Sequence, residues 1–599
     1  MLFKDFVVYL EKLESISSTL ESTRVLADLI GKLKPDEVKN ALYLSLGILG
    51  PAYDTVQFNM SDKLIIRALS VPFGLEEGKI KSEMRRIGDL GDVAATLDGR
   101  KKSSSLSINE VFSKLKYIAL LKGVGSVDQK IQTTSELLAS LSGLERKYSI
   151  RIILERLRMG FAEATLMDAL SWQLVGDKSL RTKIEAAFNV LPDIGQVGEL
   201  LLKKGIDDLQ KVTITPGVPI RPAKSERLAS PEKIIEKLGE FALEPKIDGF
   251  RAQIHVWEEK GKKQVKIFSR NLNETTDMFP DIVDAAKRAP IKSGIFDAEA
   301  VAYDLETGEF LTFQDTVKRR RKHGVEEMTA EVPLRAFIFD ILYLNGEELL
   351  QRPGNERFEL LNKINFSQAT VEKGKDLFSS TKESTAIYPL TVTEHTIVNS
   401  LDEFRRLFDL YISKGLEGVM CKKNDAVYQA GARNFNWVKY KRASEKELTD
   451  TVDAVIMGYY SGQGQRARFG IGAFLIGVID EETKQYKTIA KVGTGLKDND
   501  WIELKKRLNK FIAKTKPSFY HVVNQLTPDY WVDPKIVVEI AADEITRSPV
   551  HTAAQQEAKG TGLALRFPRF VRYIDDKDAS DVTSTKELVD LYKLQKVGK

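Results

Sequence analysis

The sequence predicts a multidomain protein of the α+β class, in which an all-α part is followed by an α+β part and then by a small β-barrel. Three observations predict it: a length of 599 residues, helical apolar periodicity over the first third, and strand-like alternation afterwards. A chain of this length is too long for a single core, so two to four domains of about 150 residues are expected. We place the boundaries at residues 1–212, 213–442 and 443–599.

The first part is predicted to be helical because its apolar residues recur at helical spacing. One stripe is formed by Val25, Leu26, Leu29, Ile30 and Leu33, and another by Ile108, Val111, Phe112, Leu115 and Ile118. No proline occurs between Pro72 and Pro192, as a bundle of helices would prefer.

Residues 213–222 interrupt the helical pattern, because three prolines within seven residues cannot continue a helix. Beyond them, apolar and polar residues alternate from Phe250 to Trp257, and the pattern predicts a hairpin that turns at residues 259–262. A polar segment at residues 442–450 precedes further short strands, including residues 452–458, 473–479 and 535–540. Short strands with glycine turns over about 150 residues favour a small barrel.

Composition places the protein among globular chains, with 42% hydrophobic and 29% charged residues. The net charge of +5 says little about partners. The basic run at residues 318–322 predicts either a contact with anions such as phosphates, which neutralise its charge, or a solvated surface loop. A single cysteine, Cys421, excludes an internal disulfide and a four-cysteine zinc site. No signal-peptide core or membrane-spanning run is seen, so an intracellular, soluble protein without membrane association is expected.

Lys246 is the candidate nucleophile, in the segment Glu244-Pro245-Lys246-Ile247-Asp248-Gly249-Phe250-Arg251. A lysine attacks only as the neutral amine, so nearby cations such as Arg251, or a metal ion that arrives with a nucleotide, are needed to disfavour its charged form. The alternative from this peptide alone is a solvated hairpin lysine before an Asp-Gly turn.

Four later segments offer further candidates. Strand alternation puts Asp297 and Glu299 on one face, where they could bind a sugar hydroxyl or a divalent cation, or simply be solvated. Phe337 is more typical of core packing, whereas Phe339 could either pack in the core or offer a ring for stacking on a base. Glu417 is a candidate metal ligand or a buried strand-edge carboxylate.

The fourth segment, residues 433–441, alternates as a strand. Trp437, Lys439 and Lys441 are predicted on one face and Val438 and Tyr440 on the other. Two lysines on one strand face repel each other unless they share an anion, for which a triphosphate is suitable.

Taken in order, these segments resemble the motifs of the nucleotidyltransferase superfamily of polynucleotide ligases and mRNA capping enzymes. The matching residues are Lys246-Ile247-Asp248-Gly249, Ser269-Arg270-Asn271, Asp297-Ala298-Glu299, Phe337 to Asp340, Glu417-Gly418-Val419 and Lys439-Tyr440-Lys441. The resemblance is closest to ATP-dependent DNA ligases of the archaeal and eukaryotic replicative type. It implies a helical DNA-binding domain, an adenylation domain and a C-terminal oligonucleotide-binding (OB) fold.

The resemblance implies that Lys246 attacks the α-phosphorus of ATP, that AMP passes to the 5′-phosphate of a nick, and that the 3′-hydroxyl then closes the strand. It assigns roles to further residues: Glu244 beside the adenine, Phe339 stacked on it, Arg251, Arg270 and Glu299 at the ribose or α-phosphate, Arg433, Lys439 and Lys441 on phosphates, and Glu299 and Glu417 on the metal. Either Arg566 or Arg569 is implied to orient the leaving pyrophosphate.

The implied cofactors are ATP and Mg²⁺, with Mn²⁺ as a substitute, and the implied substrate is nicked double-stranded DNA. A cytoplasmic monomer, associated with the nucleoid in a prokaryote, is expected. Recruitment by a sliding clamp stays open, although no convincing clamp-binding peptide is seen. One competing interpretation is an NAD-dependent ligase, a class with a four-cysteine zinc module that a single cysteine argues against. The others are an RNA ligase or capping enzyme, which generally lack a long helical domain before the lysine, and a clamp that binds nucleic acid without catalysis.

Overall fold

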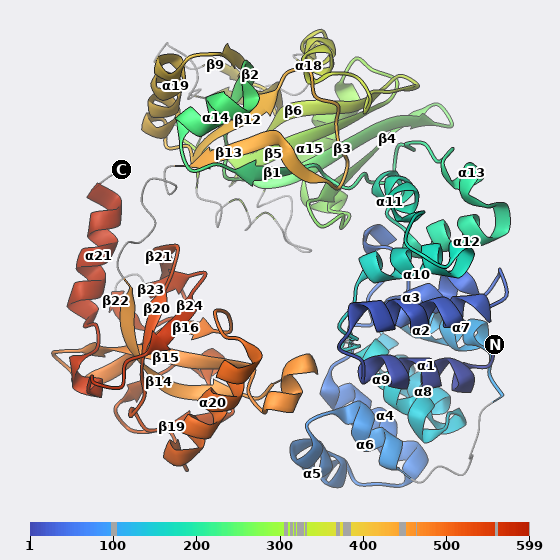
Figure 1. Cartoon of the computed structure of the whole chain (residues 1–599), viewed down its shortest axis with the longest axis vertical. Coiled ribbons are helices and arrows are strands. Elements are labelled where there is room, and N and C mark those ends of the chain that lie inside the picture. The colour runs from blue at the N-terminus through green and yellow to red at the C-terminus, as the bar shows by residue number, and fades with distance from the viewer. Residues whose placement is uncertain are drawn as a thin grey trace. The chain divides into compact units, whose positions relative to one another are not determined.

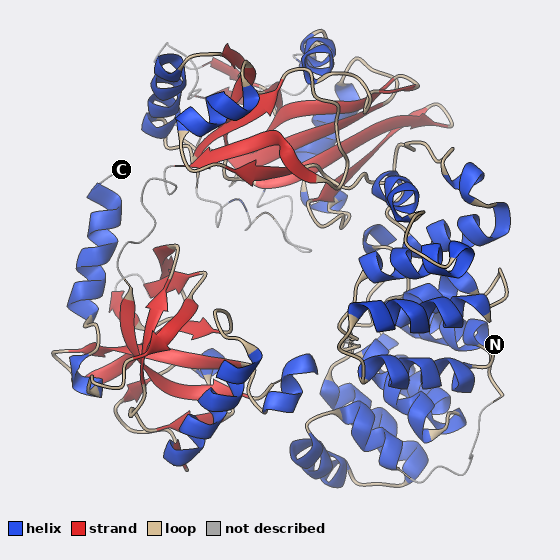
Figure 2. Ribbon diagram, viewed as in Figure 1, coloured by secondary structure: helices blue, strands red, loops and turns tan. Residues whose placement is uncertain are grey.

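The computed structural model describes residues 1–599 except residues 55, 98–104, 158, 305–308, 312–315, 317–318, 320–328, 330–331, 367–371, 375–384, 442–450, 463, 557–560 and 598–599. The chain separates into two compact units, Met1–Tyr440 and Lys441–Lys599. Figure 2 shows helices throughout the N-terminal part and mostly strands in the C-terminal unit. Helical, mixed and β parts thus follow one another in the predicted order (Figure 1).

The N-terminal part of the first unit is a stack of helices around one apolar core. The helices are α1 (Phe3–Glu14), α2 (Thr19–Gly31), α3 (Val38–Leu46), α4 (Asp62–Phe73), α5 (Glu77–Ile87), α6 (Leu90–Thr96), α7 (Ile108–Leu120), α8 (Ser126–Ser140), α9 (Gly143–Ile153), α10 (Glu163–Val175), α11 (Arg181–Val190), α12 (Ile194–Lys204) and α13 (Ile206–Leu209). The two predicted stripes lie on α2 and α7, where most of their members are buried in this core. Helix α7 begins at a capping box between Ser107 and Glu110, which satisfies two of the free backbone donors at its N-terminus.

The rest of the first unit contains two sheets with helices on their outer faces. Its elements are β1 (Lys224–Arg227), α14 (Pro231–Leu238), β2 (Phe241–Lys246), β3 (Phe250–Glu259), β4 (Lys262–Ser269), α15 (Pro280–Arg288), β5 (Gly294–Ala302), β6 (Leu334–Leu344), β7 (Glu347–Glu348), α18 (Gly354–Asn362), β8 (Glu372–Gly374), β9 (Thr385–Ile387), β10 (Leu390–Val392), β11 (Thr396–Val398), α19 (Leu401–Ser413), β12 (Gly418–Lys423) and β13 (Arg433–Lys441).

The first sheet has the order β1-β13-β12-β2-β11, and the second has the order β10-β6-β5-β3-β4 with β7 paired to β6. Apolar side chains of α14 and α19 pack on the first sheet, and those of α15 and α18 pack on the second. A third cluster, which includes Ile295, Leu342 and Trp437, combines residues of both sheets. The inner faces of the two sheets therefore meet, and side chains from β2, β12 and β13 lie near side chains from β3, β5 and β6.

The predicted hairpin is confirmed as β3 and β4, joined by Lys260 and Gly261. Both turn residues have positive φ, 51° and 71°, as a two-residue turn of this hand requires. Ala252, Ile254 and Val256 are buried against α15, as the alternation predicted. The opposite face of β3 is also buried, because Gln253 and His255 are covered by the proline-containing segment at residues 213–222.

Side chains of β3 hold that segment through its backbone. Gln253 accepts the N–H of Ile220 at 2.7 Å and donates to the carbonyl of Ile220 at 3.1 Å. His255 accepts the N–H of Gly217 at its Nδ1, at 3.1 Å, and its Nε2 lies 3.0 Å from Oε1 of Gln253. The prolines exclude regular secondary structure here, so side chains satisfy backbone groups that a helix or a sheet would otherwise pair.

The imidazole of His255 provides a pH-dependent contribution to stability. Its burial lowers the pKa of His255 to about 3, from an ordinary value of 6.5. Between pH 6.5 and about pH 4.5 the unfolded chain gains a proton that the folded protein excludes, so stability falls by about 3 kcal/mol as the pH falls. We expect the unfolding midpoint of the wild-type protein to drop more steeply over this range than that of His255→Gln. If the unfolding midpoints of the two proteins fell equally between pH 6.5 and pH 4.5, this assignment would be contradicted.

The basic run at residues 318–322 is described only at Arg319, and its other residues lie outside the described part of the chain. Arg319 is buried, pairs with Asp281 at 2.9 Å, and donates to the carbonyl of Val332 at 2.7 Å. For this residue both earlier readings, phosphate contact and solvated loop, are wrong, because an internal carboxylate neutralises the guanidinium.

The C-terminal unit is built mainly from strands, as predicted. Its elements are β14 (Val452–Tyr460), β15 (Ala473–Asp480), β16 (Gln485–Val492), α20 (Asp498–Leu508), β17 (Ile512–Ala513), β18 (Tyr520–His521), β19 (Tyr530–Val532), β20 (Val537–Ala541), β21 (Glu544–Ser548), β22 (Ala553–Gln556), β23 (Thr561–Arg566), β24 (Arg569–Tyr573) and α21 (Thr585–Val597). The large sheet runs β17-β19-β14-β15-β16-β18, with β20 paired to both β14 and β24, and β21-β23-β22 form a second sheet. Among the described residues these pairings do not close into a ring, although both sheets share one core.

Among the described residues, no helix combines the length and the apolar character that crossing a membrane requires.

Candidate active site

The candidate nucleophile lies where the two sheets of the first unit meet. Lys246 is the last residue of β2, and its carbonyl accepts the N–H of Glu417 at 3.2 Å. The Lys246 ammonium and the Glu417 carboxylate form an ion pair, with their side chains 19% and 26% exposed. The pair is thus accessible to a ligand from solvent.

The turn after Lys246 brings it close to β5. A Cβ atom at Gly249 would lie 2.3 Å from the carbonyl oxygen of Ala300 and 3.2 Å from Cγ of Glu299. Only glycine permits this approach, because any larger residue would push the turn away from β5. The predicted Asp-Gly turn therefore also determines the distance between Lys246 and Glu299.

Glu299 lies beside two cations in a largely dehydrated position. Burial raises the pKa of Glu299 to about 7, against the opposing influence of Lys246 and Arg251. In the register of β3 and β5, Arg251 lies directly opposite Glu299. The carboxylate is therefore held near the candidate nucleophile by strand pairing.

Arg251 is anchored by a buried network rather than left free to move. Its guanidinium donates to Oδ2 of Asp297 at 2.8 Å and to the carbonyl of Ala223 at 3.1 Å. The hydroxyl of Tyr428 also donates to Asp297, at 2.7 Å. Asp297 is fully buried, so the reading of Asp297 as one of two solvated carboxylates on a strand face is wrong for this residue. It neutralises Arg251, and this pairing raises the pKa of Arg251 further despite burial.

Phe339 is partly exposed, whereas Phe337 is buried in the core, as the sequence favoured. The ring of Phe339 lies 6.0 Å from that of Trp437 in an edge-on arrangement, and the Arg251 guanidinium lies 5.4 Å from the Phe339 ring. The exposed part of the ring is thus available for stacking.

Glu244 is buried, only two residues before Lys246. Its Oε2 lies 2.7 Å from Nζ of Lys422, and its Oε1 lies 3.0 Å from Nδ1 of His395. A buried carboxylate with two partners of this kind is compensated for its loss of hydration.

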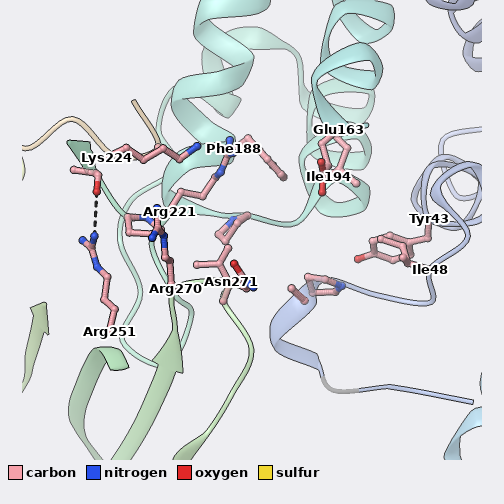
Figure 3. A pocket seen from close by; sticks show the side chains of 17 residues that line it. Tyr43, Ile48, Glu163, Phe188, Ile194, Arg221, Lys224, Arg251, Arg270 and Asn271 are labelled. Atoms are coloured by element: carbon pink, nitrogen blue, oxygen red, sulfur yellow. Dashed lines mark hydrogen bonds between the residues drawn. The ribbon is translucent and has the colours of Figure 1, made fainter. Parts of the chain in front are cut away.

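Further cations line a pocket within the first unit. Figure 3 shows Arg221, Lys224, Arg251, Arg270 and Asn271 in the lining of this pocket, together with Tyr43 and Phe188 of the helical part. Burial, together with Arg221, Arg433 and Arg270, lowers the pKa of Lys224. Such a concentration of positive charge is suited to an anion that carries several oxygen acceptors.

The remaining predicted residues lie on β13 or in the other unit. Val438 and Tyr440 of β13 pack on the helix side of the sheet, and Trp437 faces the second sheet, as the alternation predicted. By the same alternation, Lys439 lies on the same face of β13 as Trp437. Lys441 is the last residue of the strand. Arg566 and Arg569 belong to the second unit, where they pair with Glu544 and Asp543, both at 2.6 Å.

A divalent metal would find two carboxylates here. No group of three or more His, Cys, Asp and Glu side chains suited to a metal occurs in the described part of the chain. Two carboxylates, Glu299 and Glu417, fit Mg²⁺, which keeps several waters and is commonly held by one or two carboxylates together with substrate phosphates.

Lys422, His395 and Tyr428 were not identified from the sequence as members of the site. His395 is one of just five histidines in the chain, and this rarity was the signal available for it.

Comparisons with known proteins find similarity to DNA ligases along the whole chain. A family model described as "ATP dependent DNA ligase domain" matches residues 222–441, "DNA ligase N terminus" matches residues 2–171, and "ATP dependent DNA ligase C terminal region" matches residues 467–577. The "Probable DNA ligase" of Dictyoglomus turgidum is 42% identical over 601 residues, which cover 100% of this chain and 99% of the relative. "DNA ligase 1" of Methanosarcina acetivorans is 37% identical over 599 residues, covering 98% and 99%.

A solved structure titled "Pmar-Lig_Pre." is 16% identical, with a TM-score of 0.55 over 96% of this chain and 99% of that chain, and it supports the fold alone. The domain order and the family matches define an enzyme of the ligase class. The chain belongs to the ATP-dependent DNA ligase family, whose members seal nicks in DNA through adenylation. This membership implies ATP and a divalent metal ion as cofactors.

Proposed function

We propose that Lys246 is the nucleophile through which this ligase becomes adenylated. Its amine attacks the α-phosphorus of ATP, a phosphoramidate bond forms, and pyrophosphate leaves. AMP then passes from the lysine to the 5′-phosphate at a nick, and the 3′-hydroxyl displaces AMP to form the phosphodiester. The ion pair of Lys246 with Glu417 at the junction of the two sheets is the observation that carries this proposal.

Glu417 contacts the proposed nucleophile directly, through an ion pair. An amine attacks phosphorus through its lone pair, so Lys246 has to be released from this ion pair before it reacts. Glu417 would release Lys246 if its carboxylate instead held a divalent cation. We propose Glu417 and Glu299 as the metal-side carboxylates, with Mg²⁺ as the ion and Mn²⁺ as a substitute. When bound, the metal neutralises charge on the phosphate oxygens.

The other side chains are proposed to bind the nucleotide. Phe339 stacks on the adenine and Glu244 lies beside it. The ribose and phosphates are contacted by Arg251, Arg270, Glu299, Arg433, Lys439 and Lys441. Arg566 or Arg569 of the second unit orients the pyrophosphate. The exposed ring of Phe339 and the anchored guanidinium of Arg251 support these assignments.

We propose a monomer that acts on nicked duplex DNA in the cytoplasm, close to the nucleoid in a prokaryote. Arg221 and Lys224, which lie in the same basic pocket, are suited to DNA phosphates. Phosphates carry no sequence information, so a nick of any sequence can be sealed. Recruitment by a sliding clamp stays a separate proposal.

The proposed activity is tested with a singly nicked DNA duplex. ATP with Mg²⁺ should give sealed product, and removal of the metal with a chelator should reduce sealing at least 100-fold, because the charge on the leaving pyrophosphate is then poorly stabilised. Mn²⁺ should restore activity, and NAD should not replace ATP. Sealing of a nicked RNA duplex but not of nicked DNA would favour the RNA ligase reading and contradict the proposal.

A further inference from the structure

A cluster of three interacting side chains lies next to the proposed base-stacking ring of Phe339. Its members are Glu244, Lys422 and His395. They come from β2, from β12 and from the connection between β10 and β11. Glu244 has a side chain that is 3% exposed, and the side chains of Lys422 and His395 are each 10% exposed. The three side chains are therefore almost entirely removed from solvent and depend on one another for compensation.

The ammonium of Lys422 joins the carboxylate to the ring. It lies 2.7 Å from Glu244 and donates to the backbone carbonyl of Phe339 at 2.8 Å. It also lies 4.7 Å from the centre of the Phe339 ring and 4.8 Å from that of Trp437, within range of cation–π attraction. Lys422 thus connects two strands of the first sheet with β6 of the second.

His395 restrains the other oxygen of Glu244. Its ring stacks on Phe358 of α18 at 3.7 Å between ring centres, with 13° between the planes, and its Nδ1 faces Oε1 of Glu244. Among the described residues, each carboxylate oxygen therefore has one side-chain partner. An ionised carboxylate offers about four acceptor positions, so two partners leave capacity for a further donor.

We propose that Lys422 and His395 are positioning residues that set base selectivity, because they hold Glu244 as an acceptor for the amino group of adenine. This inference rests on the proposed function, in which Glu244 lies beside the base. Adenine presents an N–H donor at this edge, whereas guanine presents a carbonyl oxygen that a fixed carboxylate repels. A carboxylate released from Lys422 can turn away, and the repulsion of guanine is then lost.

The test compares self-adenylation of the full chain with α-labelled ATP and α-labelled GTP. In Lys422→Met the ratio of kcat/KM for ATP to that for GTP should fall at least tenfold, through a higher KM for ATP and a lower KM for GTP. The matched control is Lys423→Met, because Lys423 is the next residue of the same strand and pairs only with the surface residue Asp425 in the described ion pairs, at 3.3 Å. Its ratio should match that of the unaltered protein. An unchanged ratio in Lys422→Met would overturn the inference.

A second comparison stays informative if Lys422→Met fails to fold because it leaves a buried charge unpaired. Glu244→Gln/Lys422→Met removes both charges, so it should fold. If Lys422 acts through Glu244, the double variant should have the same ATP to GTP ratio as Glu244→Gln alone. A difference of more than about threefold would show that Lys422 affects the base by another route, and it would overturn the inference.

Different results would contradict the proposed function and the proposed role of Lys422. If the unaltered protein acquires no label from ATP, the proposed function is wrong. If it labels efficiently with ATP but Lys422→Met keeps the original selectivity, only the role of Lys422 is wrong.

Discussion

Substitution Lys246→Ala should abolish self-adenylation, with a fall of at least 1,000-fold in label transferred from α-labelled ATP, because alanine offers no atom that can bond to phosphorus. The label on the unaltered protein should be acid-labile, as a phosphoramidate is. The matched control is Lys262→Ala, which removes an exposed lysine of β4 in the same unit and should label normally.

Lys246→Ala also separates the first chemical step from the last. The final step transfers no group to the protein, so the variant should still seal a nick whose 5′-phosphate already carries AMP. Sealing of pre-adenylated DNA without self-labelling would assign Lys246 to nucleotide attachment alone. Persistent labelling of Lys246→Ala would show that another side chain is the nucleophile.

Substitution Asp297→Asn should destabilise the first unit by about 3 kcal/mol, because it leaves the buried Arg251 guanidinium without its counter-charge. It should also lower self-adenylation at least 100-fold, since Arg251, which we propose to contact the nucleotide, would lose the partner that holds it in place. Thermal unfolding and initial labelling rates measure the two effects separately.

A double variant distinguishes loss of folding from loss of function. Arg251→Met/Asp297→Leu replaces both charges with apolar side chains and should recover most of the lost stability. Labelling should stay low in this variant, because the Arg251 guanidinium that we propose to contact the nucleotide is absent. Recovery of labelling together with stability would show that the pair has only a structural role and that Arg251 does not bind ATP.

Local patterns in the sequence were sufficient for the elements that carry the candidate nucleophile. The alternation from Phe250 to Trp257 predicted β3 and its turn because strand faces repeat every two residues. The helical stripes on α2 and α7 could equally be predicted from the sequence, since both depend on neighbours within a few residues.

The composition of the site depends on contacts between residues that are far apart in the chain. The ion pair of Lys246 with Glu417 spans 171 residues, and the contact of Glu244 with His395 spans 151. Both arise from the order β13-β12-β2-β11 in the first sheet, which no local pattern determines. For this reason Lys422 and His395 were missed.

Burial of charged residues was the second property that required the tertiary structure. Asp297 and Arg319 were each expected to face solvent or a ligand, yet both are buried against an internal partner of opposite charge. The sequence by itself determined the domain order, the elements and the residue types available for adenylation. The tertiary structure decided which of the charged residues face the ligand and which neutralise one another, because charge compensation depends on distances in space rather than on spacing along the chain.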